Sequence, residues 1–111
     1  MIDLSNSKCE ACNKLTPKLS LDQTKELLGQ LQGWKLDENN HLQKRWSFKN
    51  FASSKKFVDA ISEIAEAPEV RHHPNITFGW GFVEVTTWTH AINGLSRNDF
   101  ILAAKIDTIV L

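Results

Sequence analysis

Residues 71–99 read RHHPNITFGWGFVEVTTWTHAINGLSRND and decide the fold. Residues 75–79 place Ile76 and Phe78 on one face of an extended segment, and residues 82–89 are rich in β-branched side chains, which favour strands. A turn with a glycine on either side of Trp80 joins the two segments. We therefore predict two antiparallel strands at 75–79 and 82–89.

The end of this stretch predicts the start of a helix. Asn93 and Gly94 are typical of a turn, and Ser96 followed by Asp99 matches a capping box, in which side chains satisfy backbone N–H groups at a helix start. The helix that follows is expected to run to residue 111 and is apolar nearly all round. Because one sheet face cannot cover that much apolar surface, we expect a second protomer to cover part of it.

The chain before residue 71 follows the same pattern of strands and helices. Its expected elements are a helix at 20–33, strands at 34–37 and 41–48, and a helix at 50–67. Ser20 and Gln23 match another capping box, Gly33 is expected to end the first helix, and Pro68 stops the second.

The order of these elements defines the fold class. Two strand pairs, each followed by a helix, with an extra helix in front, predict an α+β fold with a four-stranded antiparallel sheet and helices packed on one face. Residues 1–19 are polar and are expected to form an extended or mobile arm, and residues 20–111 are expected to form a single domain.

Composition excludes several classes of partner. The chain has 111 residues, of which 41% are hydrophobic, and its 13 basic and 13 acidic residues give a formal net charge of zero. That balance does not favour binding to nucleic acid or to a membrane surface. No apolar run approaches the roughly 20 residues of a membrane-spanning helix, and no secretory signal is visible, so we expect a cytoplasmic protein.

Cys9 and Cys12 form a single CxxC motif in the polar arm. A structural zinc site needs four ligands, and no second pair of ligands follows at a suitable spacing. We interpret the pair as reduced and incidental, with a labile metal site or a redox role as the alternatives.

Histidines provide the candidate chemistry. Three of the chain's four histidines, His72, His73 and His90, lie in the central stretch. An unperturbed histidine has a pKa of about 6.5, so it can give and take protons near neutral pH. The zinc-binding pattern of two histidines four residues apart on a helix is absent, so we expect no metal. The fourth histidine, His41, lies beside a turn and is assigned no role.

Two further residues have both a structural and a functional interpretation. Asp99 is explained by its capping position, although it could also orient a histidine, and we favour the cap. Trp88 would share a strand face with His90 if the strand continues, which makes Trp88 the best candidate for a wall that stacks on a flat ring.

The histidine pattern resembles the signature of the pterin-4a-carbinolamine dehydratases, and the similarity covers nearly the whole chain. The residues that carry it are His72-His73-Pro74, Trp80, His90 and Asp99, together with Cys9-Glu10-Ala11-Cys12, Gly33-Trp34, Phe48-Lys49-Asn50-Phe51, Trp88-Thr89-His90 and Asn98-Asp99-Phe100-Ile101-Leu102-Ala103-Ala104. In one departure, the position four residues before His72, often acidic or similar in the family, is Pro68, and the nearby acids are Glu66 and Glu69.

The resemblance implies dehydration of a 4a-hydroxytetrahydropterin to the quinonoid dihydropterin, in tetrahydrobiopterin recycling and without a cofactor. It implies that His72, His73 and His90 are catalytic. It also implies that Arg71, Trp88, Thr89 and Asp99 contact the substrate. The implied partners are a homodimer or homotetramer formed through helix faces and an aromatic amino acid hydroxylase, which produces the substrate. The alternative is a non-catalytic dimerisation or transcription cofactor, a role that animal relatives also have.

Overall fold

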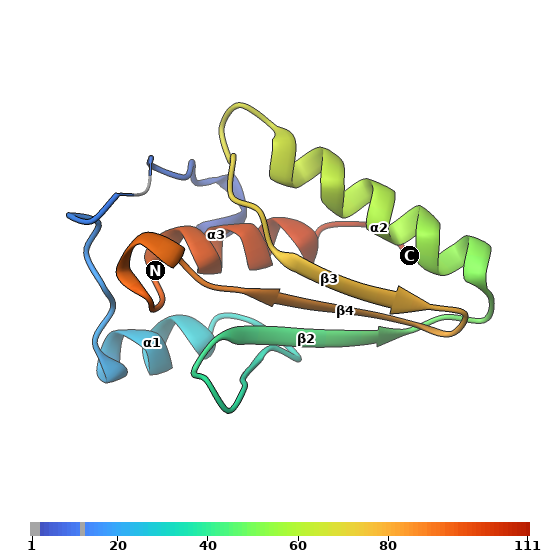
Figure 1. The fold of residues 1–111 in the computed structure, drawn as a ribbon, viewed down its shortest axis with the longest axis horizontal. Helices are drawn as coiled ribbons and strands as arrows, with labels where there is room; N and C mark the ends of the chain where they lie inside the picture. Colours follow the sequence, from blue (N-terminus) through green and yellow to red (C-terminus); the bar gives the residue numbers. More distant parts are fainter. Residues whose placement is uncertain (1–2, 12) are drawn as a thin grey trace.

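The chain folds into one antiparallel sheet with helices on one side (Figure 1). The computed structural model describes residues 3–11 and 13–111. The elements are η1 (Leu4–Asn6), α1 (Leu21–Leu28), β1 (Lys35–Leu36), β2 (Leu42–Ser47), α2 (Phe51–Glu66), β3 (Asn75–Gly79), β4 (Phe82–Thr87), η2 (His90–Ile92) and α3 (Arg97–Ile106). The strand order is β1-β2-β4-β3, and every neighbouring pair is antiparallel. The α+β prediction is confirmed.

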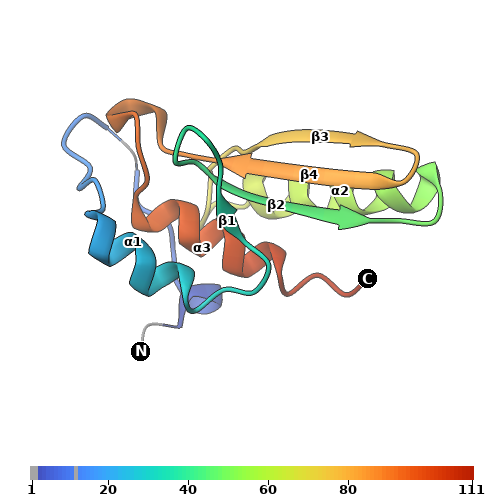
Figure 2. The same ribbon diagram turned by 90° about the horizontal axis from the view of Figure 1, so that it is seen from below.

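The alternation of side chains decides which face of the sheet the helices cover. Strand β2 pairs with β4, so that Leu42 lies opposite Thr87. Leu42, Val83, Val85 and Thr87 are fully buried, and the residues between them along each strand point to the other face and are partly exposed. Figure 2 shows this second face in front of the helix α2, which packs behind β3 and β4.

The helices complete the core with their apolar stripes. Phe57 and Ile61 of α2 and Phe100 and Leu102 of α3 are buried against the sheet residues. Asn50, where the second helix was predicted to begin, caps α2: its side chain accepts a hydrogen bond from the N–H of Ser53 at 2.8 Å.

The first helix ends earlier than predicted. Helix α1 stops at Leu28 and Gly29 is its C-cap, whereas Gly33 was expected to end it. The N–H groups of Gln30 and Leu31 bond to carbonyls three residues earlier, which tightens the chain into a turn after Gly29. Gly33 takes a φ of 79°, a left-handed value that glycine adopts at no steric cost, and turns the chain toward β1.

The last helix is also shorter than expected, because α3 ends at Ile106 and not at residue 111. The hydroxyl of Thr108 donates to the carbonyl of Lys105 at 2.6 Å, and such a local bond competes with the helical pattern. The β-branched residues that follow also have low helix propensity.

The apolar side chains of α3 are largely covered by their own chain, so they do not require the second protomer, which stays a prediction. The apolar residues of this helix, from Phe100 to Ala103 and at Ile106, are buried within one chain. The segment η1 lies against α3 and contributes the buried Leu4, and α2 covers another side. The exposed apolar residues Val110 and Leu111 lie beyond the end of the helix.

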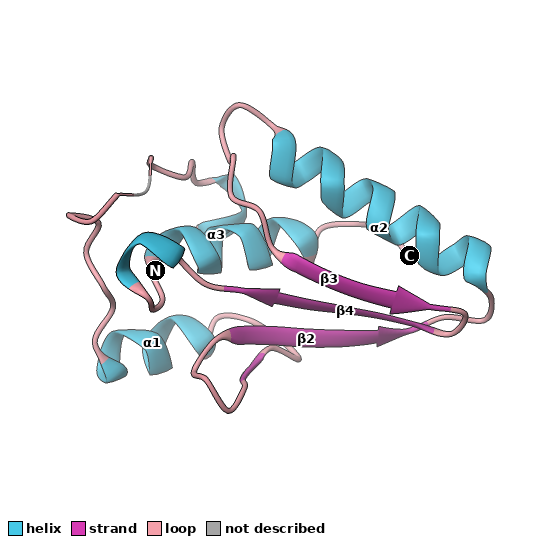
Figure 3. Cartoon of the chain, in the orientation of Figure 1, coloured by secondary structure: helices cyan, strands magenta, loops and turns pink. Residues whose placement is uncertain are grey.

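In the N-terminal arm, η1 packs against α3 and the chain that follows it is a loop (Figure 3). The N–H of Cys9 donates to the carbonyl of Glu69 at 2.9 Å. The side chain of Asn98 accepts from the N–H of Glu10 at 3.0 Å and donates to the carbonyl of the same residue at 2.6 Å. Cys12, the second cysteine of the predicted CxxC pair, lies outside the described residues.

Lys44 is a charged residue on the apolar face of β2, and the structure explains how it is accommodated. Its ammonium group lies 3.0 Å from the carboxylate of Asp107 and donates to the carbonyl of Gln32 at 2.9 Å. The same carboxylate accepts from the indole N–H of Trp34 at 3.0 Å. With side chains only 18% and 24% exposed, Lys44 and Asp107 form a pair that is largely shielded from water.

Lys44→Ala is expected to lower the free energy of unfolding by about 1–3 kcal/mol, because the partly buried Asp107 loses a charged hydrogen-bond donor. Lys55→Ala is the matched control: its pair with Asp59 has the same 3.0 Å distance, but the side chains are 60% and 63% exposed. The control is expected to change the stability by less than about 0.5 kcal/mol. Urea unfolding measures both, and equal losses would contradict this account of the Lys44 pair.

Candidate active site

The carboxylate of Asp99, at the start of α3, is the centre of the candidate site. The residue is fully buried. Its Oδ1 lies 2.6 Å from Nε2 of His72 and accepts from the hydroxyl of Thr87 at 2.7 Å. Its Oδ2 accepts from the hydroxyl of Thr89 at 2.8 Å and from the N–H of Ser96 at 3.0 Å. An ionised carboxylate offers about four acceptor positions, so these four partners fill them.

Asp99 therefore has both of the roles that the sequence left open. Its bond to the Ser96 N–H is the predicted cap of α3, and its bond to His72 orients a histidine. An ionised carboxylate only accepts hydrogen bonds. The His72 ring must therefore carry a proton on Nε2, whether the ring is neutral or charged. The single proton of Thr89 goes to Asp99, so the Ser96 hydroxyl, 2.7 Å away, donates to Thr89.

The loop after α2 brings His72 inward. Arg71 has a φ of 43°, a left-handed conformation, and its N–H bonds to the carbonyl of Ala67 at 3.1 Å. This turn leaves the Arg71 side chain exposed, while Val70 is buried and His72 is only 8% exposed.

His73 points away from that buried pair. Its Nε2 lies 2.6 Å from Oε1 of Glu66 at the end of α2, and both side chains are exposed, by 63% and 73%. Of the two acids near Pro68, Glu66 is thus the one that pairs with a candidate histidine. Its proximity to the histidines in sequence was a signal, but only the turn through residues 67–71 shows that Glu66, and not Glu69, contacts His73.

His90 lies just after the end of β4. The strand stops at Thr87, and Thr89 pairs with Gly94 across a short loop, so the strand does not continue to His90 as the shared-face argument required. The rings of Trp88 and His90 nevertheless lie in contact, with centroids 4.3 Å apart and planes at 39°.

The structure also adds His41, which was assigned no role. Its ring is stacked on the indole of Trp88, with centroids 4.1 Å apart and planes at 4°. The periodicity of the two strands put both residues on the polar face, but nothing in the sequence indicated that β2 and β4 are neighbours.

The predicted site residues thus fall into three separate sets of contacts. His72, Thr89 and Asp99 share one hydrogen-bond network, His73 pairs with Glu66, and His90 contacts Trp88. Thr89 and Asp99 are 1% and 0% exposed, and their side chains contact other protein groups. Trp80, the tryptophan of the family motif, is 69% exposed at the opposite end of the β3–β4 hairpin from these residues.

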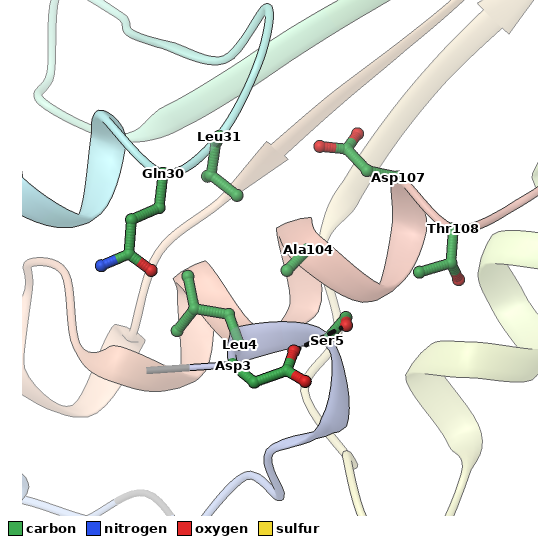
Figure 4. A pocket seen from close by; sticks show the side chains of 8 residues that line it. All are labelled: Asp3, Leu4, Ser5, Gln30, Leu31, Ala104, Asp107 and Thr108. Atoms are coloured by element: carbon green, nitrogen blue, oxygen red, sulfur yellow. Dashed lines mark hydrogen bonds between the residues drawn. The ribbon is translucent and has the colours of Figure 1, made fainter. Parts of the chain in front are cut away.

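Other features of the described chain lie apart from this site. A hollow of about 450 Å³ is lined by η1, the chain after α1 and the end of α3, with Leu31 and Asp107 among its side chains (Figure 4). None of the three candidate histidines lines it. In residues 3–11 and 13–111, no group of three or more His, Cys, Asp or Glu side chains is placed to hold a metal ion. Across the same residues, no helix is both long and apolar enough to span a membrane.

Comparisons with known proteins agree with the fold and the residue pattern. The family model for pterin 4 alpha carbinolamine dehydratase matches residues 17–109. A relative from Rickettsia canadensis (strain McKiel) that bears this family name is 46% identical over 109 residues, covering 97% of this chain and 98% of that protein. A relative of the same name from Rubrobacter xylanophilus is 40% identical over 107 residues, covering 96% and 98%.

A solved structure is also similar. The crystal structure of a transcriptional coactivator/pterin dehydratase from Brucella melitensis matches with a TM-score of 0.75 and 28% identity, covering 82% of this chain and 96% of that chain. Together these matches define an enzyme of the hydro-lyase class. Within that class, the chain belongs to the pterin-4a-carbinolamine dehydratase family, as its residue pattern predicted.

Asp99→Asn is expected to move the ring proton of His72 off Nε2. The N–H of Ser96 cannot reorient, so the amide oxygen must face it, and the amide NH₂ must face His72 and Thr87. Nε2 would then accept a hydrogen bond. The ¹⁵N chemical shift of Nε2 reports its protonation, and Thr87→Val, which keeps the carboxylate, is the control. A protonated Nε2 in Asp99→Asn would contradict this geometry.

Proposed function

We propose that this protein dehydrates a 4a-hydroxytetrahydropterin to the quinonoid dihydropterin by histidine acid–base catalysis, as a step in tetrahydrobiopterin recycling. The observation that carries the proposal is the buried Asp99–His72 pair. Two exposed histidines lie nearby in sequence: His73 is paired with Glu66, and His90 contacts Trp88. Membership of the dehydratase family supports the same reaction.

The reaction needs two proton transfers. The hydroxyl group on C4a must gain a proton so that it leaves as water, and a ring nitrogen must lose its proton as the C=N bond forms. Both atoms belong to the substrate, so no electrons are exchanged with another reactant. A well-placed acid or base contributes about 10²–10⁴-fold to the rate of such a step.

The surroundings of each histidine suggest its role. His90 is exposed and therefore accessible to a ligand, so we assign it one proton transfer. His72 is held by Asp99 in one tautomer, as an acid–base group must be, and we assign it the other. His73 is exposed beside a carboxylate, and we assign it to binding the pterin ring.

The histidine roles predict different kinetic changes. His90→Ala is expected to lower kcat by about 10²–10⁴-fold, whereas His73→Ala is expected mainly to raise KM. The measurement is the rate of dehydration of freshly generated 4a-hydroxytetrahydropterin, followed by absorbance. His72 is buried, so His72→Asn, which keeps a polar group near Asp99, is paired with an unfolding curve to separate lost catalysis from lost folding.

The control is Lys56→Ala on the solvent side of α2, which should leave turnover unchanged. A folded wild-type protein that does not accelerate dehydration, or a His90→Ala variant with full turnover, would count against the catalytic proposal.

Glu66→Gln tests whether the carboxylate beside His73 contributes to substrate binding. The variant keeps the size of the side chain but loses the charge next to His73, so KM is expected to rise in the same direction as in His73→Ala and by less. Glu63→Gln, three residues earlier on an exposed face of the same helix, is the matched control. Equal KM values for the two variants would show that Glu66 has no part in binding.

A partner-binding role is the second candidate, and an exposed aromatic patch favours it. Phe51, Phe78 and Trp80 are 50%, 36% and 69% exposed, and the first two rings lie 5.6 Å apart. The patch lies at the opposite end of the β3–β4 hairpin from the histidines, so a partner or a second copy there would leave the site open. The similar Brucella melitensis protein is described as a coactivator as well as a dehydratase. Turnover that disappears in His90→Ala while the size of the particle stays the same would separate the two functions.

A further inference from the structure

The position of His41 follows from the pairing of β2 with β4. Leu42 lies opposite Thr87 in this antiparallel pair. His41 precedes Leu42 and Trp88 follows Thr87, so the same register places His41 opposite Trp88. Leu42 and Thr87 point into the core, so His41 and Trp88 point to the sheet face that the helices leave uncovered. Their stacking at 4.1 Å is the cross-strand contact that this register creates.

The backbone of His41 is held firmly. Its N–H donates to the side-chain carboxylate of Asp37 at 2.9 Å, and its carbonyl accepts from the N–H of Asp37, also at 2.9 Å. Asn40 takes a φ of 60° in the turn between them. Both backbone groups of His41 are thus hydrogen-bonded to Asp37, and these bonds fix the position from which the His41 ring contacts Trp88.

The ring of His90 has less support than those of the other two candidate histidines. His72 is bonded to Asp99, and His73 is paired with Glu66. Within residues 3–11 and 13–111, no side chain forms a hydrogen bond or an ion pair with the His90 ring, and its ring contact is with Trp88. The orientation of His90 therefore depends on the indole, and one face of that indole is covered by His41.

We propose that His41 is a positioning residue, which fixes Trp88 and, through it, the ring of His90. The kinetic consequence of this role rests on the proposed dehydratase function. An aromatic pair contributes a specific, flat contact, and without it the half-buried indole gains freedom to rotate. The flat ring stacked on Trp88 is thus the imidazole of His41, and the indole in turn supports the ring of His90.

The first test compares His41→Ala with His41→Phe, which restores a flat ring. His41→Ala is expected to lower kcat by roughly twofold to tenfold, the range that matches the loss of one aromatic contact, with KM little changed. His41→Phe is expected to keep kcat close to that of the wild type. Arg45→Ala is the control, because Arg45 lies on the same face of β2 but contacts Glu84 and Phe82.

The second test follows the His90 ring by NMR and does not depend on turnover. Its ring protons are assigned by their loss in His90→Gln, and their chemical shifts report the adjacent indole. His41→Ala should move these signals, and His41→Phe and Arg45→Ala should leave them near the wild-type positions. In a Trp88→Leu background, His41→Ala should have no further effect on kcat or on the signals, because the route between the two histidines is gone.

The outcomes separate the two proposals. Unchanged His90 signals in His41→Ala, a His41→Phe variant as impaired as His41→Ala, or a full effect of His41→Ala in the Trp88→Leu background would each overturn the positioning role. A wild-type protein without dehydratase activity would remove the proposed function, and the NMR comparison would still decide whether His41 positions His90.

Discussion

A buried carboxylate with four hydrogen-bond partners is the constraint on which the rest of this structure depends. Asp99 accepts from β4 through Thr87, from the chain after β4 through Thr89, from the start of α3 through Ser96, and from the loop after α2 through His72. An unpaired buried charge would cost several kcal/mol, so these segments can pack together only when all of the donors are in place. The same geometry that closes the core thus determines the tautomer of the histidine.

The three candidate histidines differ in how they are held, and the difference relates to exposure. His72 has a buried ionic partner, His73 has an exposed one, and His90 rests on an aromatic ring. A buried partner gives a fixed orientation, because water cannot compete for its hydrogen bond. An exposed pair contributes little energy and leaves the histidine free to adjust. The three candidates therefore comprise one rigidly held group and two groups whose rings are exposed.

Periodicity and capping signals were enough to predict the order of helices and strands, because both are local properties of the sequence. The alternation from Val83 to Thr87, the capping boxes at Ser20 and Ser96, and the start of a helix near residue 50 were predicted correctly. The pairing of β2 with β4 could not be predicted, since alternation says nothing about which strand lies alongside. For the same reason the sequence pointed to His72, His73 and His90 but not to His41, whose partner Trp88 is far away along the chain.

Helix α3 carries both Asp99 and the apolar residues from Phe100 to Ile106 that cover the inner face of the sheet. It is the last of the described helices along the chain, so a chain emerging from the ribosome displays all four strands before α3 can pack on them. Until α3 arrives, the core lacks Phe100, Leu102 and Ile106, and His72 does not have the carboxylate of Asp99 as its partner. Helix α3 therefore supplies its part of the core and the fixed histidine tautomer at the same moment of synthesis.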